Sequence, residues 1–271
     1  MTTASIVVHR TSPSMLEGLL KTLARENVVH VYIVDNSPDQ FLAAIVPDSP
    51  KFEYIHVENN GYGAAHNIAI RKAMLRGADY HLVLNPDIDW NGTIVDKLES
   101  IMNNRPTCGM IHPRVTYPDG SLQHTCRMLP APIDVFGKRF LPKAVMKRRL
   151  RRYLLSDSDY DREFNAVYVQ GSFMFLRLDI LREIGLFDER FFMYPEDIDL
   201  TRRIRARADV LFRPDVTVVH KHEASSYKSL KMLWIHCINM VKYFNKWGWM
   251  FDSERKRLNS QLKSLLLKNQ R

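Results

Sequence analysis

The stretch Tyr80-His-Leu-Val-Leu-Asn-Pro-Asp87 joins a short apolar run to a polar turn. The run Tyr80 to Leu84 is typical of a buried β-strand, because it is short and ends at a turn signal. In α/β proteins, ligand-handling groups lie just beyond the carboxyl ends of parallel strands. A divalent cation held between phosphates needs only one or two protein carboxylates, and Asp87 could be one. The stretch indicates a metal–diphosphate site, although Asn-Pro-Asp is also ordinary turn chemistry.

Strands and helices alternate on both sides of this stretch. From the apolar patterns we expect strands at 5–9, 28–34, 52–57, 80–84, 109–115, 167–176, near 211 and at 216–219, and helices at 14–25, 64–76, 94–102, 178–184 and 195–208. Alternation at this spacing predicts an α/β fold with a mainly parallel, Rossmann-like sheet and helices on both faces.

Two segments interrupt or extend this pattern. We interpret 117–166 as an irregular, basic excursion from a catalytic domain at 1–225, facing an acceptor or a membrane. Residues 226–271 read as a C-terminal extension of basic, aromatic and amphipathic helices. Lys138 to Arg152 contains eight Lys and Arg and no acid, whereas the remainder outside both basic segments is net acidic. Such basic, aromatic segments suit an anionic membrane surface or a lipid diphosphate; a solvated basic face is the alternative.

Composition excludes several classes of protein. The 271 residues are 45% hydrophobic and 25% charged, which is ordinary for a soluble globular chain. The three cysteines are widely spaced and have no metal-finger spacing, so a reducing compartment is expected. The N-terminus lacks the features of a signal peptide, and no run approaches the ~18 apolar residues of a membrane span. No nucleic-acid motif accompanies the basic segments, so no nucleic-acid partner is expected.

Polar groups fall at the predicted ends of several strands. Asp35 follows the second strand and could accept a hydrogen bond from the imide N–H of uracil or thymine; an Asx turn is the alternative. His220 ends the last strand and could bind Mn²⁺, although a lone histidine is more often structural. Since such ends converge on one edge, Asp35, Asp87 and His220, with Asp197 at the start of a helix, could share a cleft.

The richest polar cluster is Tyr194-Pro-Glu-Asp-Ile-Asp-Leu200. Pro195 suits the first helical position, which would place Glu196 and Asp197 in the first turn. Acids there satisfy the helix dipole, which is one explanation. Aromatic residues crowd the same turn, however, and aromatic walls would desolvate a carboxylate and raise its pKa toward that of a useful base.

These features together resemble the family 2 inverting glycosyltransferases of GT-A fold, in particular their bacterial rhamnosyltransferase-like branch. The most specific stretch is Gly185-Leu-Phe-Asp-Glu-Arg-Phe-Phe-Met-Tyr-Pro-Glu-Asp-Ile-Asp-Leu200, followed by Arg203. The other matching motifs, in the family's order, are Val34–Ser37, Asn59–Asn67, Leu84–Asp87, Gly171–Arg177 and Val218–His220. The resemblance covers roughly Ser5 to Ser226 and implies a GT-A catalytic domain.

The resemblance implies a role for each matching polar residue. Asp35 would hold the nucleotide base, and Asp87 would be the last residue of the metal-binding acidic motif, with Asn85 in place of its first acid. Asp197 would be the general base and His220 a second ligand of Mn²⁺ or Mg²⁺. Asn59 and Asn67 would shape the pocket for the nucleotide-sugar donor. Acceptor or secondary contacts would come from Gly171, Tyr194, Glu196 and Arg203.

The implied reaction is a single displacement at the anomeric carbon of the donor. The donor favoured by the branch is dTDP-L-rhamnose, with a UDP-sugar as the alternative. The acceptor would be a lipid-diphosphate-linked glycan of bacterial cell-surface polysaccharide, reached peripherally at the cytoplasmic face of the plasma membrane. Whether the C-terminal helices contact the membrane, a second subunit of a homo-oligomer or the core is left open. Two other functions compete: a sugar-phosphate nucleotidyltransferase and a non-catalytic, membrane-associated glycan-binding protein.

Overall fold

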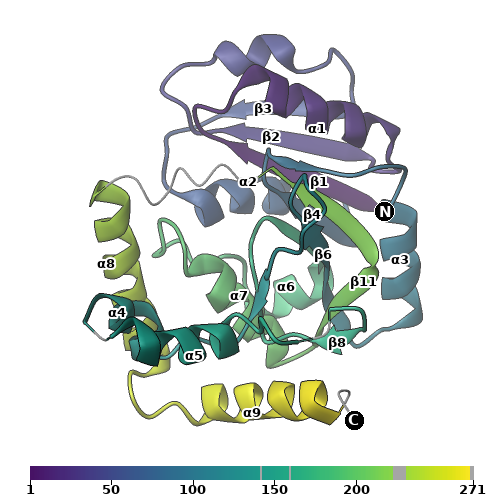
Figure 1. The fold of residues 1–271 in the computed structure, drawn as a ribbon. Coiled ribbons are helices and arrows are strands. Elements are labelled where there is room, and N and C mark those ends of the chain that lie inside the picture. Colours follow the sequence, from purple (N-terminus) through teal and green to yellow (C-terminus); the bar gives the residue numbers. More distant parts are fainter. Residues whose placement is uncertain (141, 159, 222–229, 269–271) are drawn as a thin grey trace.

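The computed structural model describes residues 1–271 except 141, 159, 222–229 and 269–271. Within these residues a nine-stranded sheet forms the centre, in the order β3-β2-β1-β4-β10-β6-β11-β5 with β8 on β11 (Figure 1). Its strands are β1 (Thr2–Val8), β2 (His30–Asp35), β3 (Phe52–His56), β4 (Tyr80–Leu84), β5 (Ile88–Asp89), β6 (Cys108–Thr116), β8 (Phe164–Asn165), β10 (Phe173–Arg177) and β11 (Asp209–His220). A separate ribbon pairs β7 (Cys126–Arg127) with β9 (Tyr168–Val169).

The strand directions bring the predicted polar residues to one edge. β1, β2, β3 and β4 run parallel, as do β6 and β11, whereas β10 is antiparallel to both of its neighbours. Val8 pairs with Asp35, and Ile6 with Leu84, so β1, β2 and β4 end close together. Asp35 and the Asn85-Pro86-Asp87 turn therefore lie at the carboxyl ends of these strands, where an α/β sheet places its ligand-binding groups.

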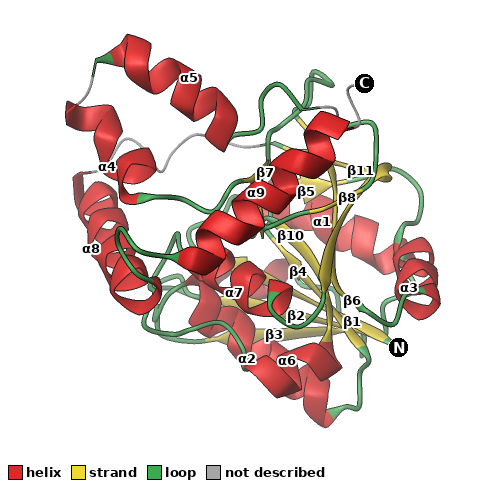
Figure 2. Cartoon of the chain, turned by 90° about the horizontal axis from the view of Figure 1, so that it is seen from below, coloured by secondary structure: helices red, strands yellow, loops and turns green. Residues whose placement is uncertain are grey.

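Helices cover both faces of the sheet (Figures 1 and 2). They are α1 (Pro13–Arg25), α2 (Tyr62–Leu75), α3 (Val95–Asn104), α4 (Pro132–Phe140), α5 (Lys143–Tyr153), α6 (Leu178–Ile184), α7 (Glu196–Arg205), α8 (Leu230–Trp247) and α9 (Ser253–Lys268), with a short 3-10 helix at Phe41–Ile45. One core contains apolar residues of α1 and α3, and the other contains those of α2, α6, α7, α8 and α9. The predicted fold class, a mainly parallel sheet between helices with helices at the C-terminus, is confirmed.

Residues 117–166 are more regular than predicted. This segment forms α4, α5 and two short strands, β7 and β8. The basic run of α5 consists mainly of Lys, Arg, Leu and Met, which are good helix formers. Burial of Met146, a residue of this helix, stabilises it further. The prediction of an irregular excursion was wrong for these elements.

Two strand predictions also need correction. The expected strand 167–176 is divided into β9 and β10 by a turn at Gly171-Ser172, because Asn85 N–H bonds the Ser172 carbonyl and β10 starts only beyond it. The two strands expected near 211 and at 216–219 are one strand, β11, whose register against β6 shifts between Arg213 and Thr217. A strand irregularity of this kind leaves the chain extended while breaking the apolar alternation.

The C-terminal helices are fastened to α7. The guanidinium of Arg202 is fully buried and makes two hydrogen bonds of 2.6 and 2.7 Å to Asp252 and a third to Glu254. From the same helix, the carboxylate of Asp199 accepts a hydrogen bond from the Trp247 indole N–H at 2.7 Å. The inner faces of α8 and α9 thus contact the core, and residues 226–229 of the predicted extension lie outside the described part of the chain. Among the described residues, every helix is too short or too polar to cross a bilayer.

Candidate functional site

A short antiparallel pairing places His220 beside Asp87. β5 follows the Asn85-Pro86-Asp87 turn directly and pairs with the end of β11, where His220 lies opposite Ile88. The N–H of Lys221 also bonds the Asp87 carbonyl at 2.9 Å. As a result, His220 Nε2 lies 3.2 Å from Asp87 Oδ2, although 132 residues separate the two in the chain. These two predicted metal ligands therefore come together.

Gln123 determines which nitrogen of His220 carries the proton. The Gln123 Nε2 amide donates to the His220 carbonyl at 2.9 Å, which turns its Oε1 toward His220 Nδ1, also at 2.9 Å. An amide oxygen only accepts, so the Gln123 contact places a proton on Nδ1 and leaves Nε2 directed at the Asp87 carboxylate. An imidazole nitrogen and a carboxylate oxygen at this distance can together ligate one cation.

The donor set at this corner fits a divalent metal. Asp87 Oδ1 is buried and has no hydrogen-bond partner among the described residues. An imidazole nitrogen and a carboxylate are acceptable ligands for Mn²⁺, and Mg²⁺ prefers oxygen. No group of three or more His, Cys, Asp or Glu side chains in the described ranges is arranged to hold a metal. Asp87 and His220 would therefore supply two ligands, and a bound diphosphate and water the others.

The predicted base lies at the start of α7. Pro195 is the N-cap rather than the first helical residue, so the helix begins at Glu196. Tyr194, just before it, has a positive φ of 93° and packs edge-on against His236. Oδ1 of Asp197 accepts the N–H of Ile198 at 2.7 Å, and Oδ2 accepts the N–H of Gly171 at 3.0 Å. The carboxylate is thereby held in one orientation.

Burial changes the acidity of both adjacent carboxyls. Glu196 and Asp197 are 4% and 8% exposed. Burial is the main cause that raises the pKa of Asp197 to about 7, and its two backbone hydrogen bonds and Arg127 partly oppose this rise. Burial and the neighbouring charge of Asp197 raise the pKa of Glu196 well above its usual value. Asp197 therefore exchanges its proton near neutral pH, as a general base requires, and Glu196 holds its proton to a higher pH than an exposed glutamate does.

A chain of contacts joins this carboxylate to the Asp87 corner. The Tyr62 hydroxyl lies 2.7 Å from the Gly171 carbonyl and 3.0 Å from Asn85 Oδ1. The N–H of Asn85 in turn bonds the Ser172 carbonyl at 2.9 Å. Asn85 therefore supports the site through Tyr62 and the Gly171-Ser172 turn, and Asp197, Gly171, Asn85, Asp87 and His220 form one continuous region.

Asp35 and Asn59 occupy a neighbouring set of turns. Asp35 is fully buried; its Oδ1 accepts the N–H of Ser37 at 2.7 Å, which is an Asx turn, and its Oδ2 accepts the Tyr54 hydroxyl at 2.6 Å. Asn59 Oδ1 accepts the N–H of Gly61, and its amide lies near His9. The Asx-turn alternative describes Asp35 in this structure, and its contact with a base remains a prediction.

Asn67 and Arg203 both fasten the segment before α7. The Asn67 amide pairs with the backbone N–H and carbonyl of Phe187 at 3.0 and 2.9 Å. Arg203 donates to Asp199 and to the carbonyls of residues 184–186. Their polar atoms are therefore engaged in positioning this segment, and the structure shows no contact of either side chain with Asp87 or Asp197 in the described part of the chain.

Sequence reasoning missed several residues around the carboxylates. Gln123 and Arg127 lie in the segment interpreted as irregular, and neither belongs to a motif. The aromatic surroundings of Asp197 include Tyr62, Tyr153 and Tyr168, whose pKa values are raised by burial and further by its charge. Of these, only Tyr62 had a signal, because it stands in the quoted Asn59–Asn67 stretch.

Comparison with known proteins identifies relatives along most of the chain. An N-acetylglucosaminyl-diphospho-decaprenol L-rhamnosyltransferase of Mycobacterium tuberculosis is 32% identical over 221 residues, which are 76% of this chain and 70% of that protein. The rhamnosyltransferase WbbL of Escherichia coli K12 is 27% identical over 252 residues, or 88% of this chain and 90% of that protein. The chain matches no family model.

Solved glycosyltransferase structures share the fold. GalNAc-T7, crystallised with UDP, GalNAc and Mn²⁺, superposes with a TM-score of 0.62 at 15% identity, over 81% of this chain and 43% of that one. The mannosyltransferase PcManGT of Pyrobaculum calidifontis, in complex with GDP-Man and Mn²⁺, gives a TM-score of 0.55 at 15% identity, over 90% of this chain and 63% of that one. At such identities these matches concern the fold alone. With the rhamnosyltransferase relatives and this fold, the chain belongs to the family 2 glycosyltransferases of GT-A fold, in their rhamnosyltransferase-like branch.

Proposed function

We propose that this glycosyltransferase transfers L-rhamnose from dTDP-L-rhamnose to a lipid-diphosphate-linked glycan, with inversion at the anomeric carbon. The observation that carries the proposal is the continuous region from Asp197 through Gly171 and Asn85 to the Asp87–His220 corner. A base and a diphosphate-holding corner on one sheet edge are the two functions that a single displacement needs. The Mycobacterium relative is an N-acetylglucosaminyl-diphospho-decaprenol L-rhamnosyltransferase, which supports the choice of sugar and acceptor.

In this mechanism Asp197 takes the proton of an acceptor hydroxyl while the hydroxyl oxygen attacks the anomeric carbon. The bond from that carbon to the donor diphosphate breaks on the opposite face, so the configuration inverts and a nucleoside diphosphate leaves. Asp87 and His220 would hold Mn²⁺ or Mg²⁺, which when bound neutralises charge on the departing diphosphate. Asp35 and Asn59 would contact the base end of the donor, and Glu196, beside Asp197, would contact the acceptor.

The proposed function also gives a role to each of the two predicted segments of the chain and a location to the enzyme. In the proposed division, residues 1–225 are catalytic and 226–271 form an extension that faces the membrane; within it, Trp247, Asp252 and Glu254 fasten the helix α7. The enzyme would act peripherally at the inner face of the bacterial plasma membrane. The basic segments support this location, because anionic lipids attract such segments.

A direct assay separates the proposal from its rivals. The purified chain is incubated with dTDP-L-rhamnose, a prenyl-diphosphate-linked N-acetylglucosamine and Mn²⁺, and the products are identified by mass spectrometry with the anomeric configuration read by NMR. We expect one added deoxyhexose in inverted configuration and release of dTDP. Formation of a nucleotide sugar from sugar phosphate and dTTP would establish the nucleotidyltransferase instead, and binding of the acceptor without turnover would establish a glycan-binding protein.

A thermal-shift screen tests the donor separately. We expect dTDP-L-rhamnose to raise the melting temperature more than UDP-sugars do, and only with Mn²⁺ or Mg²⁺ present. A uniform response to all nucleotide sugars would reject the choice of donor.

A further inference from the structure

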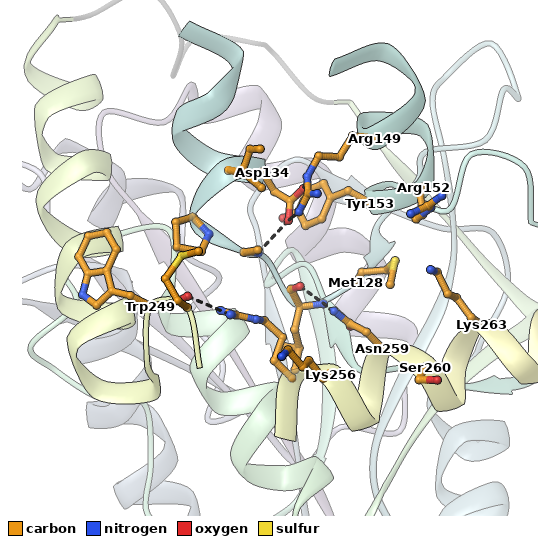
Figure 3. A pocket seen from close by; sticks show the side chains of 16 residues that line it. Met128, Asp134, Arg149, Arg152, Tyr153, Trp249, Lys256, Asn259, Ser260 and Lys263 are labelled. Carbon is orange, nitrogen blue, oxygen red and sulfur yellow. Dashed lines mark hydrogen bonds and ion pairs between the residues drawn. The ribbon is translucent and has the colours of Figure 1, made fainter. Parts of the chain in front are cut away.

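A pocket of about 520 Å³ lies between α5, α9 and the segment that leads into α4 (Figure 3). We call it the α5–α9 pocket. α5 contributes Arg149, Arg152 and Tyr153, and α9 contributes residues from Arg255 to Lys263. None of these side chains belongs to the Asp87–His220 corner, so the pocket is a second candidate site.

Hydrogen bonds to the backbone fix the walls of this pocket. The Asn259 amide binds both the N–H and the carbonyl of Leu129 at 2.9 Å. Arg255 is 6% exposed and donates to the carbonyls of Pro130 and Trp249. Arg149 pairs with Asp134, the acidic residue of the lining. The shape is therefore held before any ligand binds, which lowers the entropic cost of binding.

Three cations of the lining remain without an ion pair among the described residues: Arg152, Lys256 and Lys263. Figure 3 shows Arg152 of α5 and Lys263 of α9 pointing toward each other from opposite walls. Burial, and next the charge of Arg152, lower the pKa of Lys263. Two like charges held close together raise the free energy of the empty pocket, and an anion between them would remove that cost.

Trp249 lies at the opposite end of the pocket from Arg152 and Lys263 (Figure 3), and the rim there is apolar and exposed. Trp249, Met250 and Phe251 are 39%, 71% and 94% exposed, and Trp249 and Met250 line the pocket itself. Ile133, another lining residue, is 39% exposed. Large apolar side chains exposed at the edge of a pocket are typical of a binding site for an apolar group. Cations inside and apolar side chains at the rim match an anion attached to a hydrocarbon chain.

The pocket adjoins the candidate base. Tyr153 lines the pocket, and burial raises its pKa to about 12; Arg127 opposes this rise, and the charges of Asp134 and Asp197 add to it. Met128, also in the lining, follows Arg127, whose charge acts on Asp197. A ligand in the α5–α9 pocket would therefore lie on the Asp197 side of the molecule, where the acceptor must approach.

We propose that the α5–α9 pocket binds the diphosphate of a prenyl-diphosphate amphiphile through Arg152, Lys256 and Lys263, with the hydrocarbon chain leaving across Trp249, Met250 and Phe251. The identification of this amphiphile with the sugar acceptor rests on the proposed function. Binding at the pocket itself does not require that function.

Farnesyl diphosphate is a suitable probe, and its affinity can be measured by isothermal titration calorimetry in EDTA without any nucleotide sugar. EDTA removes divalent metal, so the Asp87–His220 corner cannot hold the probe through a cation. In the full chain, the double variant R152Q/K263Q should weaken binding by at least about tenfold. The matched variant R148Q/R257Q removes the same two charges from the same two helices outside the pocket lining, and should weaken binding less than about twofold.

Equal losses in the two double variants, or no loss in either, would overturn the proposal, provided that circular dichroism shows both variants folded. Vesicles of equimolar phosphatidylglycerol and phosphatidylcholine distinguish a bilayer headgroup from a prenyl diphosphate. We expect both double variants to lose vesicle binding alike, because diffuse charge attracts anionic lipid. If R152Q/K263Q selectively lost vesicle binding and kept farnesyl diphosphate, the pocket would be a phospholipid site. If the probe bound as proposed while no sugar were transferred, only the proposed function would fail.

Discussion

The backbone N–H of Gly171 donates a 3.0 Å hydrogen bond to Oδ2 of Asp197, and this contact joins the β9–β10 turn to the first turn of α7. The close approach depends on the absence of a side chain at residue 171. A Cβ built there would lie 3.3 Å from Asp197 Cβ and 3.5 Å from Tyr62 Cε1. The position of the candidate base is thus set by a glycine in another element.

Gly171→Ala should reduce kcat about tenfold while the protein stays folded. The added methyl would move Asp197 by a few tenths of an ångström, and small misplacements of a reacting group are costly. Steady-state kinetics with saturating donor would measure the effect. Gly18→Ala is the matched control, since a Cβ at Gly18 in α1 meets nothing within 4 Å. Unchanged kcat in Gly171→Ala would show that this contact does not position the base.

Asp197→Asn should lower kcat by at least about 100-fold, because an amide cannot take the acceptor's proton. Its affinity for the donor should change less than about twofold, as the amide oxygen can still accept one of the two backbone N–H groups that hold the carboxylate. Transfer assays and donor titrations together test both statements. Turnover at the parent rate would mean that Asp197 is not the base. Asp179→Asn, at an exposed position of α6, serves as the control.

The pH dependence of the reaction should report the acidity of Asp197. Since burial raises its pKa to about 7, kcat/KM should rise with pH through neutrality and level off above it. Arg127 lowers this pKa, so Arg127→Gln should move the midpoint to higher pH. Arg151→Gln, on exposed α5 surface, should leave the midpoint in place. A midpoint that Arg127→Gln moved toward lower pH would contradict the assignment.

Much of the fold and part of this site could be predicted from the strand ends alone. Asp87 and His220 were expected on one edge because each follows an apolar run, and general sheet geometry brings such ends together. Gln123 could not be found in this way, because its role depends on a turn in 117–166 reaching back to β11. For Asp35 the sequence left two interpretations open, a contact with the base and an Asx turn. In the structure its carboxylate forms the Asx turn, which any Asp-Asn-Ser sequence can form. The turn at Gly171 was hidden inside an apolar run that reads as one strand.

Glu196 should make the protein less stable at alkaline pH. Its folded-state pKa is raised by burial and by Asp197, so the folded chain holds the proton to a higher pH than the unfolded chain does. Stability is therefore greatest below the unfolded pKa of Glu and falls as pH rises from there toward the folded pKa. Glu196→Gln should flatten this fall, as measured by urea unfolding at a series of pH values above the unfolded pKa of Glu. A slope parallel to that of the parent would contradict the raised pKa, and Glu17→Gln, exposed on α1, should give that parallel slope.

Gln123→Leu should weaken Mn²⁺ binding by about 10- to 100-fold, the usual effect of losing an outer partner of a metal-bound histidine. Without the Gln123 oxygen, the His220 ring loses the partner that holds Nδ1 and is free to rotate, so Nε2 is no longer held toward Asp87. Electron paramagnetic resonance of free Mn²⁺ measures the affinity without any sugar transfer. Gln123→Glu keeps an acceptor for Nδ1 and should bind more tightly than Gln123→Leu, whereas Gln40→Leu, at an exposed position, should match the parent. Parent-like Mn²⁺ affinity in Gln123→Leu would mean that the Gln123–His220 pair does not orient a metal ligand.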